Sequence, residues 1–192
     1  MASRDPENKV VLIGHVNVGK TSLFLRLKDG KFHEDAEQVV MKRKEANFTK
    51  SFSNGSQLTL YDTAGMEKYQ STLPTSYLRE LSAIVFVYAV DDEESFHGLT
   101  MWFEEVPAMR GVIKVLVGNK TDLTAAVDSS TAMQWARNND VDDSMVFRVS
   151  AKTDDQVTEM FQQIADKISP TKTVQRSQPL PSEKKSGDCC KK

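Results

Sequence analysis

Residues 14–21 read GHVNVGKT and fit the pattern G-x-x-x-x-G-K-[ST] of a phosphate-binding loop. The apolar run 10–13 before them predicts a buried parallel strand, and residues 22–27 after them can continue as a helix. In such a unit the glycines let the backbone wrap a polyphosphate, which faces amide N–H groups and a helix N-terminus. Lys20 then reaches the outer phosphates, and the hydroxyl of Thr21 ligates Mg²⁺. The sequence therefore predicts a polyphosphate site. The alternative interpretation is a glycine-containing turn before a helix.

The 192-residue chain is 39% apolar, which predicts one globular domain with an ordinary core. We expect a flexible N-terminal segment over 1–8, the domain over 9–170, and a disordered tail over 171–192, where Pro, Ser, Lys, Thr and Gln dominate without periodicity. The tail holds six basic and two acidic residues, a charge of +4, which leaves −6 of the total −2 for residues 1–170. An acidic body argues against nucleic-acid binding, and a basic tail indicates an anionic surface as its partner.

The two cysteines, Cys189 and Cys190, are adjacent and close to the C-terminus. We therefore expect no disulfide framework and no cysteine metal site in the body, which fits a cytosolic protein. The first ten residues lack the apolar stretch of a secretory signal, and no run approaches the ~20 apolar residues that a transmembrane helix needs.

Strand and helix patterns alternate along the chain, which predicts an α/β fold with a mostly parallel sheet wrapped by helices. Residues 48–62 predict a hairpin with Asn54-Gly55 as its turn. Residues 30–47 carry many charges without a clear period and predict a functional loop. The other predicted strands are 10–13, 83–90, 112–117 and 145–149, and the predicted helices are 21–28, 95–109, 129–138 and 155–168, the last with an apolar stripe at Val157, Met160, Phe161, Ile164 and Ile168.

Residues 62–65 read DTAG and end the second arm of the predicted hairpin. An aspartate at the C-terminal end of a strand lies beside the phosphate crevice of an open parallel sheet. Asp62 can hold Mg²⁺ there, usually through water, while the N–H of Gly65 faces the terminal phosphate. Four such residues are a weak signal alone and a strong one after a phosphate-binding loop.

Residues 119–122 read NKTD and follow the predicted strand 112–117. The carboxylate of Asp122 can accept hydrogen bonds from N1–H and the exocyclic amine of guanine, a donor pair that adenine lacks. An adenine mismatch should cost several kcal/mol, roughly 1–3 for each hydrogen bond left unmade. Asn119 supports the loop and the other edge of the purine, and the stem of Lys120 can cover the base face. The alternative interpretation is a polar turn after a strand.

Residues 150–152, SAK, follow the last predicted strand and offer a backbone N–H to the guanine carbonyl oxygen and a second lysine stem. Four motifs in this order, each after a predicted strand, resemble those of the Ras-like small GTPases across roughly residues 8–168. Within that superfamily the chain is most similar to the Rab family. The Rab-like segments are 58–69 (LTLYDTAGMEKY), 77–79 (YLR), 116–123 (LVGNKTDL) and the terminal cysteine pair, and the spacing of Leu73-Pro74 and Tyr77 is similar to that in endosomal Rabs.

The resemblance implies a three-layer P-loop fold of six strands and about five helices, binding of GTP and GDP with Mg²⁺, and switch segments near 32–48 and 63–78. It implies a GTPase that acts in vesicle traffic as a monomer. Thr21 and Asp62 are the expected metal ligands. The expected catalytic positions are Lys20, Gly65 and Met66. The residues expected to bind nucleotide are Gly14, Asn17, Val18, Gly19, Lys20, Thr21, Ser22, Phe32, Asp62, Gly65, Asn119, Lys120, Asp122, Ser150, Ala151 and Lys152.

The resemblance also implies a set of partners. These are effectors, an exchange factor, an escort protein, a GDP-dissociation inhibitor and a geranylgeranyl transferase that modifies Cys189 and Cys190. Two lipid chains hold a membrane stably where one does so only marginally. The lysines at 184, 185, 191 and 192 add attraction of about 1 kcal/mol each near an anionic leaflet. The expected location is the cytoplasmic face of endomembranes, with endosomes as one candidate, and the cytosol when the protein is extracted.

Three departures from the family pattern surround the γ-phosphate. Met66 stands where the family has the glutamine that orients the attacking water. Val16 occupies a loop position that is usually small, where its branched side chain would crowd that water and an arginine finger. Residues 31–48 contain neither Thr nor Ser, so the Mg²⁺-binding threonine of the first switch is missing; counting along the chain places it at Val39 or near Arg43. Together they predict slow hydrolysis with nucleotide binding retained.

Two other interpretations remain open. A non-catalytic pseudo-GTPase, held in one state as an interaction scaffold, is favoured by the altered first switch. A phosphate-loop kinase or ATPase is disfavoured by Asn119 and Asp122.

Overall fold

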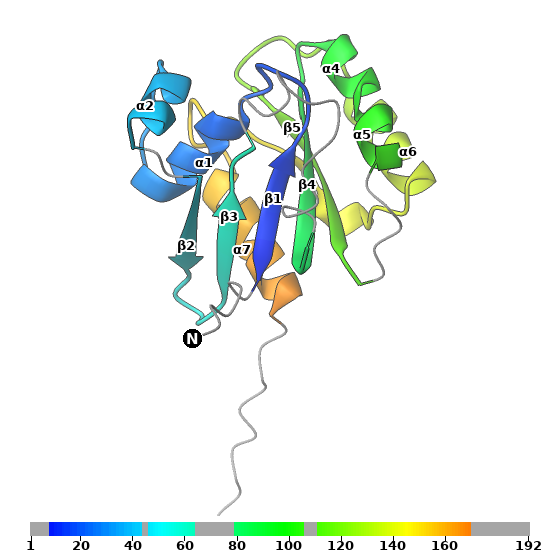
Figure 1. Cartoon of the computed structure of the whole chain (residues 1–192). Coiled ribbons are helices and arrows are strands. Elements are labelled where there is room, and N and C mark those ends of the chain that lie inside the picture. The colour runs from blue at the N-terminus through cyan, green and yellow to red at the C-terminus, as the bar shows by residue number, and fades with distance from the viewer. Residues whose placement is uncertain (1–7, 44–45, 64–78, 106–110, 170–192) are drawn as a thin grey trace, which may run out of the picture.

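The computed structural model describes residues 8–43, 46–63, 79–105 and 111–169. Their centre is a six-stranded sheet with the order β2-β3-β1-β4-β5-β6, in which β2 and β3 pair antiparallel and every other neighbouring pair is parallel. Figure 1 shows the parallel strands pointing to one edge of the sheet. The strands are β1 (Lys9–Ile13), β2 (Asn47–Ser51), β3 (Gln57–Tyr61), β4 (Leu81–Ala89), β5 (Ile113–Asn119) and β6 (Val146–Arg148).

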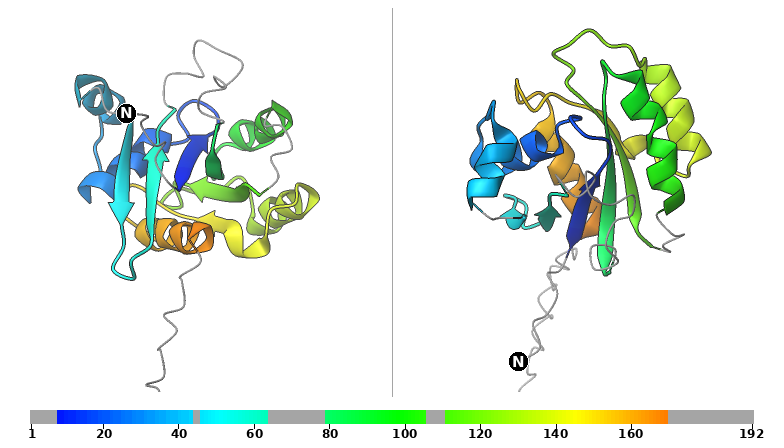
Figure 2. Two further views of the ribbon diagram at one scale, coloured as in Figure 1. Left: turned by 60° about the horizontal axis from the view of Figure 1, so that its bottom comes forward. Right: turned by 45° about the horizontal axis from the view of Figure 1, so that its top comes forward.

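Helices cover both faces of this sheet, which gives three layers. Figure 2 shows α1 and α7 on one face and α4, α5 and α6 on the other. The three-layer, mostly parallel fold predicted from the sequence is confirmed. The α-helices of the described residues are α1 (Lys20–Asp29), α2 (Ala36–Arg43), α4 (Glu93–His97), α5 (Leu99–Glu105), α6 (Ser129–Asn138) and α7 (Val157–Ile168), and a 3₁₀ turn, η1 (Asp143–Met145), precedes β6.

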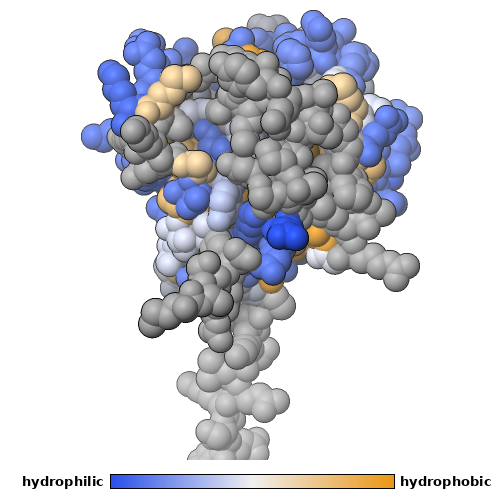
Figure 3. All heavy atoms as spheres, in the orientation of Figure 1, coloured by the Kyte–Doolittle hydropathy of each residue, from blue (hydrophilic) through white to orange (hydrophobic). Residues whose placement is uncertain are grey.

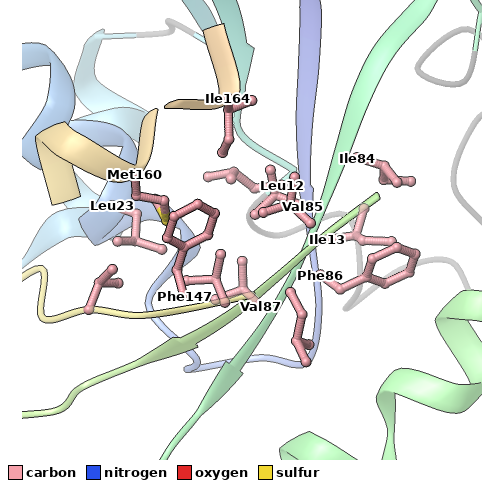
Figure 4. Packing of buried hydrophobic residues seen from close by; sticks show 14 of the residues in the cluster. Leu12, Ile13, Leu23, Ile84, Val85, Phe86, Val87, Phe147, Met160 and Ile164 are labelled. Atoms are coloured by element: carbon pink, nitrogen blue, oxygen red, sulfur yellow. The ribbon is translucent and has the colours of Figure 1, made fainter. Parts of the chain in front are cut away.

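The core forms because the central strands are apolar on both faces. β1 and most of β4 are buried along their length, as expected for a parallel sheet covered twice. Figure 4 shows the neighbours Leu12 and Ile13 pointing to opposite faces, with Ile164 of α7 on the side of Leu12 and Phe86 on the side of Ile13. The predicted stripe on α7 is buried, except that Ile168 at its end is half-buried. Because these side chains are buried between the helices and the sheet, they hold the sheet in place, and with it the edge from which the functional loops extend.

Two predicted helices have different bounds. The predicted helix 95–109 begins earlier, where Asp92 caps α4 by accepting a hydrogen bond from the N–H of Ser95 at 3.2 Å, and it divides into α4 and α5 at Gly98. Glycine has a low helix propensity, which favours a break there. Residues 106–109 of the predicted helix lie outside the described residues.

The predicted helix 155–168 begins at 157, because Gln156 is left-handed (φ 56°) and Asp155 forms a β-bridge with Ser150.

The expectation of a loop without secondary structure over 30–47 is wrong, because residues 36–43 form α2 beside α1 (Figure 1). The segment AEQVVMKR is rich in strong helix formers. Ala36 is buried and Val39, one turn later, packs against the core while half-exposed. The apolar spacing of three residues is the signal for a helix, and the many charges around it concealed that spacing.

Most of the described surface that is visible in Figure 3 is polar. In the view of Figure 3 hydrophobic residues appear in small separate areas among hydrophilic ones. Among the described residues the large hydrophobic side chains that are exposed are Phe32, Met41, Met101 and Leu123. None of the helices in this part of the chain is both long and apolar enough to span a bilayer.

Candidate nucleotide-binding site

A cleft of about 500 Å³ lies where the loops after β1, β5 and β6 meet the segment that leads into α2. It sits at the carboxyl edge of the parallel strands, which is where open α/β sheets bind ligands. Eleven of the residues predicted to bind nucleotide line it, and they come from four separate segments of the chain: Asn17, Gly19, Lys20, Thr21, Ser22, Phe32, Asn119, Lys120, Asp122, Ala151 and Lys152.

Two glycines of the phosphate loop are required by close backbone approaches. Gly14 has φ 146°, and a Cβ there would lie 2.1 Å from the carbonyl oxygen of Val87 in β4. Gly19 has φ 92°, and its Cβ would lie 2.3 Å from Nδ2 of Asn119. Side chains at these positions would displace the loop from β4 and from the end of β5. The glycines therefore hold the loop against both.

Lys20 begins α1 and is almost completely buried, at 4% exposure. Its ammonium group donates to the carbonyl oxygens of Gly14 at 3.0 Å and His15 at 2.7 Å. The charge is thus held at the loop, beside the first amides of α1, where an anion gains from both the ammonium and the helix N-terminus.

Thr21 and Asp62, the expected Mg²⁺ ligands, are both buried, at 6% and 5% exposure. Thr21 lines the cleft, whereas Asp62 follows β3 and is not among the lining residues. The hydroxyl of Thr63 donates to the carbonyl oxygen of Leu12 at 2.7 Å, which fixes the end of β3 to β1. A hydroxyl and a carboxylate are the oxygen donors that Mg²⁺ prefers. No group of three or more His, Cys, Asp or Glu side chains suited to a metal occurs in the described residues. Since Mg²⁺ prefers six oxygen ligands, Thr21 and Asp62 would leave the other positions to phosphate oxygens and water.

Asn119 joins three loops. Its Nδ2 donates to the carbonyl oxygen of Val18 at 2.8 Å, and its Oδ1 accepts from the N–H of Ala151 at 3.1 Å. The side chain is 2% exposed, so these hydrogen bonds are shielded from water. The N–H of Ala151 predicted for the guanine carbonyl therefore already has a partner, and a base oxygen would share it with Asn119 or replace Asn119.

Asp122 is held by the loop after β6. Its Oδ1 accepts from the hydroxyl of Ser150 at 2.6 Å, and its Oδ2 lies 4.0 Å from Nζ of Lys152. The Ser150 hydroxyl oxygen in turn accepts from the N–H of Thr153 at 3.1 Å. Ser150 is fully buried and does not line the cleft, so it orients the carboxylate from behind.

The remaining predicted residues fall into two groups. Gly14, Val18, Ser150 and Asp62 support the cleft without lining it. Gly65, Met66, Cys189 and Cys190 lie outside the described residues. Of the two departures that are described, Val16 is half-buried in the loop and Val39 packs against the core, and neither lines the cleft.

Five lining residues were missed by the sequence analysis. They are Leu123, directly after Asp122, and four residues at or before the first turn of α2: Glu34, Asp35, Ala36 and Gln38. The signal that could have found the second group was the helical spacing of Ala36 and Val39, which places the start of a helix four residues after Phe32.

The sheet order, the phosphate loop after β1 and the carboxylate after β5 define a P-loop nucleotide-binding protein. The sequence model of the Ras family matches residues 9–170, and the chain belongs to that family. It is 36% identical over 168 residues to a protein of Geodia cydonium named Ras-related protein Rab-21, an alignment that covers 83% of this chain and 70% of the relative. The predicted membership of the Ras-like, Rab-type small GTPases is confirmed. Members of this family in general bind guanine nucleotides with Mg²⁺ and hydrolyse GTP.

Proposed function

We propose that this chain is a Rab-like molecular switch that binds GTP and GDP in the described cleft, hydrolyses GTP slowly and is tethered to membranes of vesicle traffic by its tail. One observation carries the nucleotide part: Asp122, Asn119 and Ala151 line the same cleft as Lys20 and Thr21. One end of the cleft therefore offers groups for a guanine base and the other offers groups for phosphates.

Guanine selection follows from the donors and acceptors at the base end. The carboxylate of Asp122 accepts from N1–H and the exocyclic amine of guanine. Adenine has no such pair, and the carboxylate would remain desolvated without a donor, at a cost of several kcal/mol. The Ser150 hydroxyl, at 2.6 Å, keeps the carboxylate in place for this contact.

Phosphate binding is assigned to the start of α1. The loop amides and Lys20 would bind the outer phosphates, and Thr21 and Asp62 would hold Mg²⁺, which would supply positive charge against the polyphosphate. Water attack needs a side chain that positions it, and the thioether of Met66 cannot do so. Val16 and the missing switch threonine further weaken hydrolysis, so GTP would stay bound without being hydrolysed quickly.

The hydrolysis proposal is tested by restoring the glutamine. We expect Met66→Gln to raise the single-turnover rate of GTP hydrolysis, because the amide can hold water in line where the thioether cannot. Met66→Leu is the matched control, since it changes shape without adding a polar group. Equal rates in both variants would show that Met66 does not limit hydrolysis.

The tether proposal rests on Cys189 and Cys190 in a basic tail. We propose that both thiols carry geranylgeranyl groups and that the lysines beside them add attraction to an anionic leaflet. The transferase, the escort protein, the GDP-dissociation inhibitor, the exchange factor and effectors are the proposed partners, at the cytoplasmic face of endomembranes. Mass spectrometry of the protein from eukaryotic cells should show two lipid additions, and two unmodified thiols would contradict the tether.

A second candidate is a pseudo-GTPase that serves as an interaction scaffold. The observation that favours it is α2, which occupies the first switch segment as a helix with Val39 packed on the core. A switch held this way would not reorder with the γ-phosphate. Amide exchange of residues 36–43 separates the two: a switch changes between the GDP and GTP forms, and a scaffold does not.

The experiment that tests the nucleotide proposal is a competition. Fluorescent GDP bound to the whole protein is displaced with unlabelled GTP, GDP or ATP in the presence of Mg²⁺. We expect GTP and GDP to displace it and ATP to fail by at least 100-fold, because only adenine leaves Asp122 unpaired. Equal displacement by ATP would refute guanine specificity.

A further inference from the structure

Arg26 lies on α1, two turns beyond the phosphate loop, and its guanidinium group points to the loop after β6. Its Nε donates to the carbonyl oxygen of Ala151 at 2.8 Å, and its Nη2 donates to that of Lys152 at 2.8 Å. The side chain is 10% exposed, and Asp154 lies 3.9 Å from Nε. Arg26 itself does not line the cleft. Its contacts are nevertheless made to two residues that do.

A third hydrogen bond runs from the same guanidinium group to the end of α1. Nη1 donates to the carbonyl oxygen of Gly30 at 3.0 Å. Gly30 ends α1 in a left-handed conformation (φ 67°), with its N–H bonded to the carbonyl oxygen of Arg26. Two residues later Phe32 lines the cleft. One side chain therefore holds the segment that leads to Phe32 and the segment that contains Ala151.

We propose that Arg26 is a positioning residue that fixes the base end of the cleft and thereby sets how long a guanine nucleotide stays bound. This inference rests on the proposed nucleotide binding. Ala151 lies in the loop between β6 and α7 (residues 149–156, the base loop). Its N–H donates to Oδ1 of Asn119 at 3.1 Å, and its carbonyl oxygen accepts from Nε of Arg26 at 2.8 Å. Holding the carbonyl side of this residue fixes the direction of the donor on its other side.

Only a planar group with several donors satisfies this geometry. The guanidinium group presents donors in a rigid fork, whereas a lysine ammonium is a point charge on a flexible stem. A lysine at position 26 could keep the positive charge near Asp154 but could not bond to all three carbonyl oxygens in these directions. Loss of the fork leaves carbonyl groups in a partly buried loop without a partner, which loosens the loop.

The test compares Arg26→Met, Arg26→Lys and Lys28→Met in the whole protein loaded with fluorescent GDP. Lys28→Met is the matched control, because Lys28 is on the same helix, carries the same charge and places its ammonium group 6.0 Å from the ring centroid of Phe48 in β2. We expect Arg26→Met to speed GDP release about tenfold or more, the scale of one charge-assisted hydrogen bond. Arg26→Lys should speed it nearly as much, and Lys28→Met should leave it unchanged.

Amide hydrogen exchange distinguishes positioning from a general loss of stability. In the Arg26 variants exchange should rise at residues 30–33 and 150–153 and stay unchanged at 14–21. A uniform rise along α1 and the phosphate loop, or GDP release equal to that of Lys28→Met, would overturn the positioning role. If Arg26→Met fails to fold, Arg26→Lys decides, since a release rate equal to wild type would also overturn it. Failure of the wild-type protein to bind GDP would instead refute the proposed function, and this role of Arg26 with it.

Discussion

Among single residues, Asn119 and Asp122 connect the base end of the cleft to the fold. Asn119 bonds to the phosphate loop and to Ala151 while it is 2% exposed. Asp122 is bonded to Ser150, a residue buried behind the cleft. Both side chains are therefore fixed before a ligand arrives, which is the condition for strong selection between bases.

Replacing Asp122 should change which base is bound. In Asp122→Asn the side chain gains an N–H₂ donor, so it suits the C2 carbonyl of xanthine rather than the amine of guanine. We expect affinity for GDP to fall at least 100-fold and affinity for xanthosine diphosphate to rise, as measured by displacement of labelled nucleotide. Asp140→Asn, at a residue that does not line the cleft, serves as the control. Unchanged preference in Asp122→Asn would show that the carboxylate does not contact the base.

Among the elements, α2 determines the shape of the cleft mouth. Its first turn and the residues before it contribute Glu34, Asp35 and Gln38 to the lining. The helix is held by contact with α1 and by the hydrogen bond from the N–H of Val39 to the carbonyl oxygen of Asp35 at 3.1 Å. The carboxylates of Glu34 and Asp35 thus line the part of the cleft that is formed by the segment leading into α2.

The stability of α2 can be changed without touching the cleft. Met41 lies on α2 and is 69% exposed, so its replacement changes mainly helix propensity. Met41→Gly should destabilise the helix by about 1 kcal/mol relative to Met41→Ala. We expect faster amide exchange at Val39 in Met41→Gly and near-native exchange in Met41→Ala. Equal exchange in the two variants would mean that residues 36–43 are not helical in solution.

The N-terminus of α6 contributes stability that depends on pH. Asp128 caps the helix by accepting hydrogen bonds from the N–H of Thr131 and from the hydroxyl of Ser130, which lower the pKa of its carboxyl group from 3.8 to about 2. Because the folded-state pKa is depressed, this stabilisation is complete above pH 3.8 and is lost as the pH falls toward 2.

Asp128→Asn tests this, since it keeps a capping side chain without a charge. The wild-type protein should unfold at a higher denaturant concentration than Asp128→Asn at pH 6. The difference should shrink as the pH falls from 4 to 2, in equilibrium denaturation monitored by circular dichroism. A constant difference across this range would contradict a role for the charged form.

For the molecule as a whole, the fold could be predicted because its central strands are apolar and bounded by motifs. The runs that became β1, β4 and β5 were found with ends within two residues of those observed. Most of the predicted residues that line the cleft belong to motifs at the ends of β1, β5 and β6. The part contributed by α2 could not be predicted, because Ala36 and Val39, which mark its buried side among the described side chains, are surrounded by charges. The hydrogen bonds from Arg26 to Ala151 and Lys152 join residues more than 100 positions apart in sequence, so no local pattern could predict them.

The most direct test of the account is to identify the nucleotide in freshly purified protein. The protein is denatured, and the released nucleotide is separated by ion-exchange chromatography. We predict a guanine nucleotide that is mostly GTP, because the groups that bind base and phosphate are intact while Met66 and Val16 oppose hydrolysis. An adenine nucleotide, or none, would contradict guanine binding in the cleft. Mostly GDP would leave the site assignment in place and contradict the proposed slow hydrolysis, if the single-turnover rate also equals that of Met66→Gln.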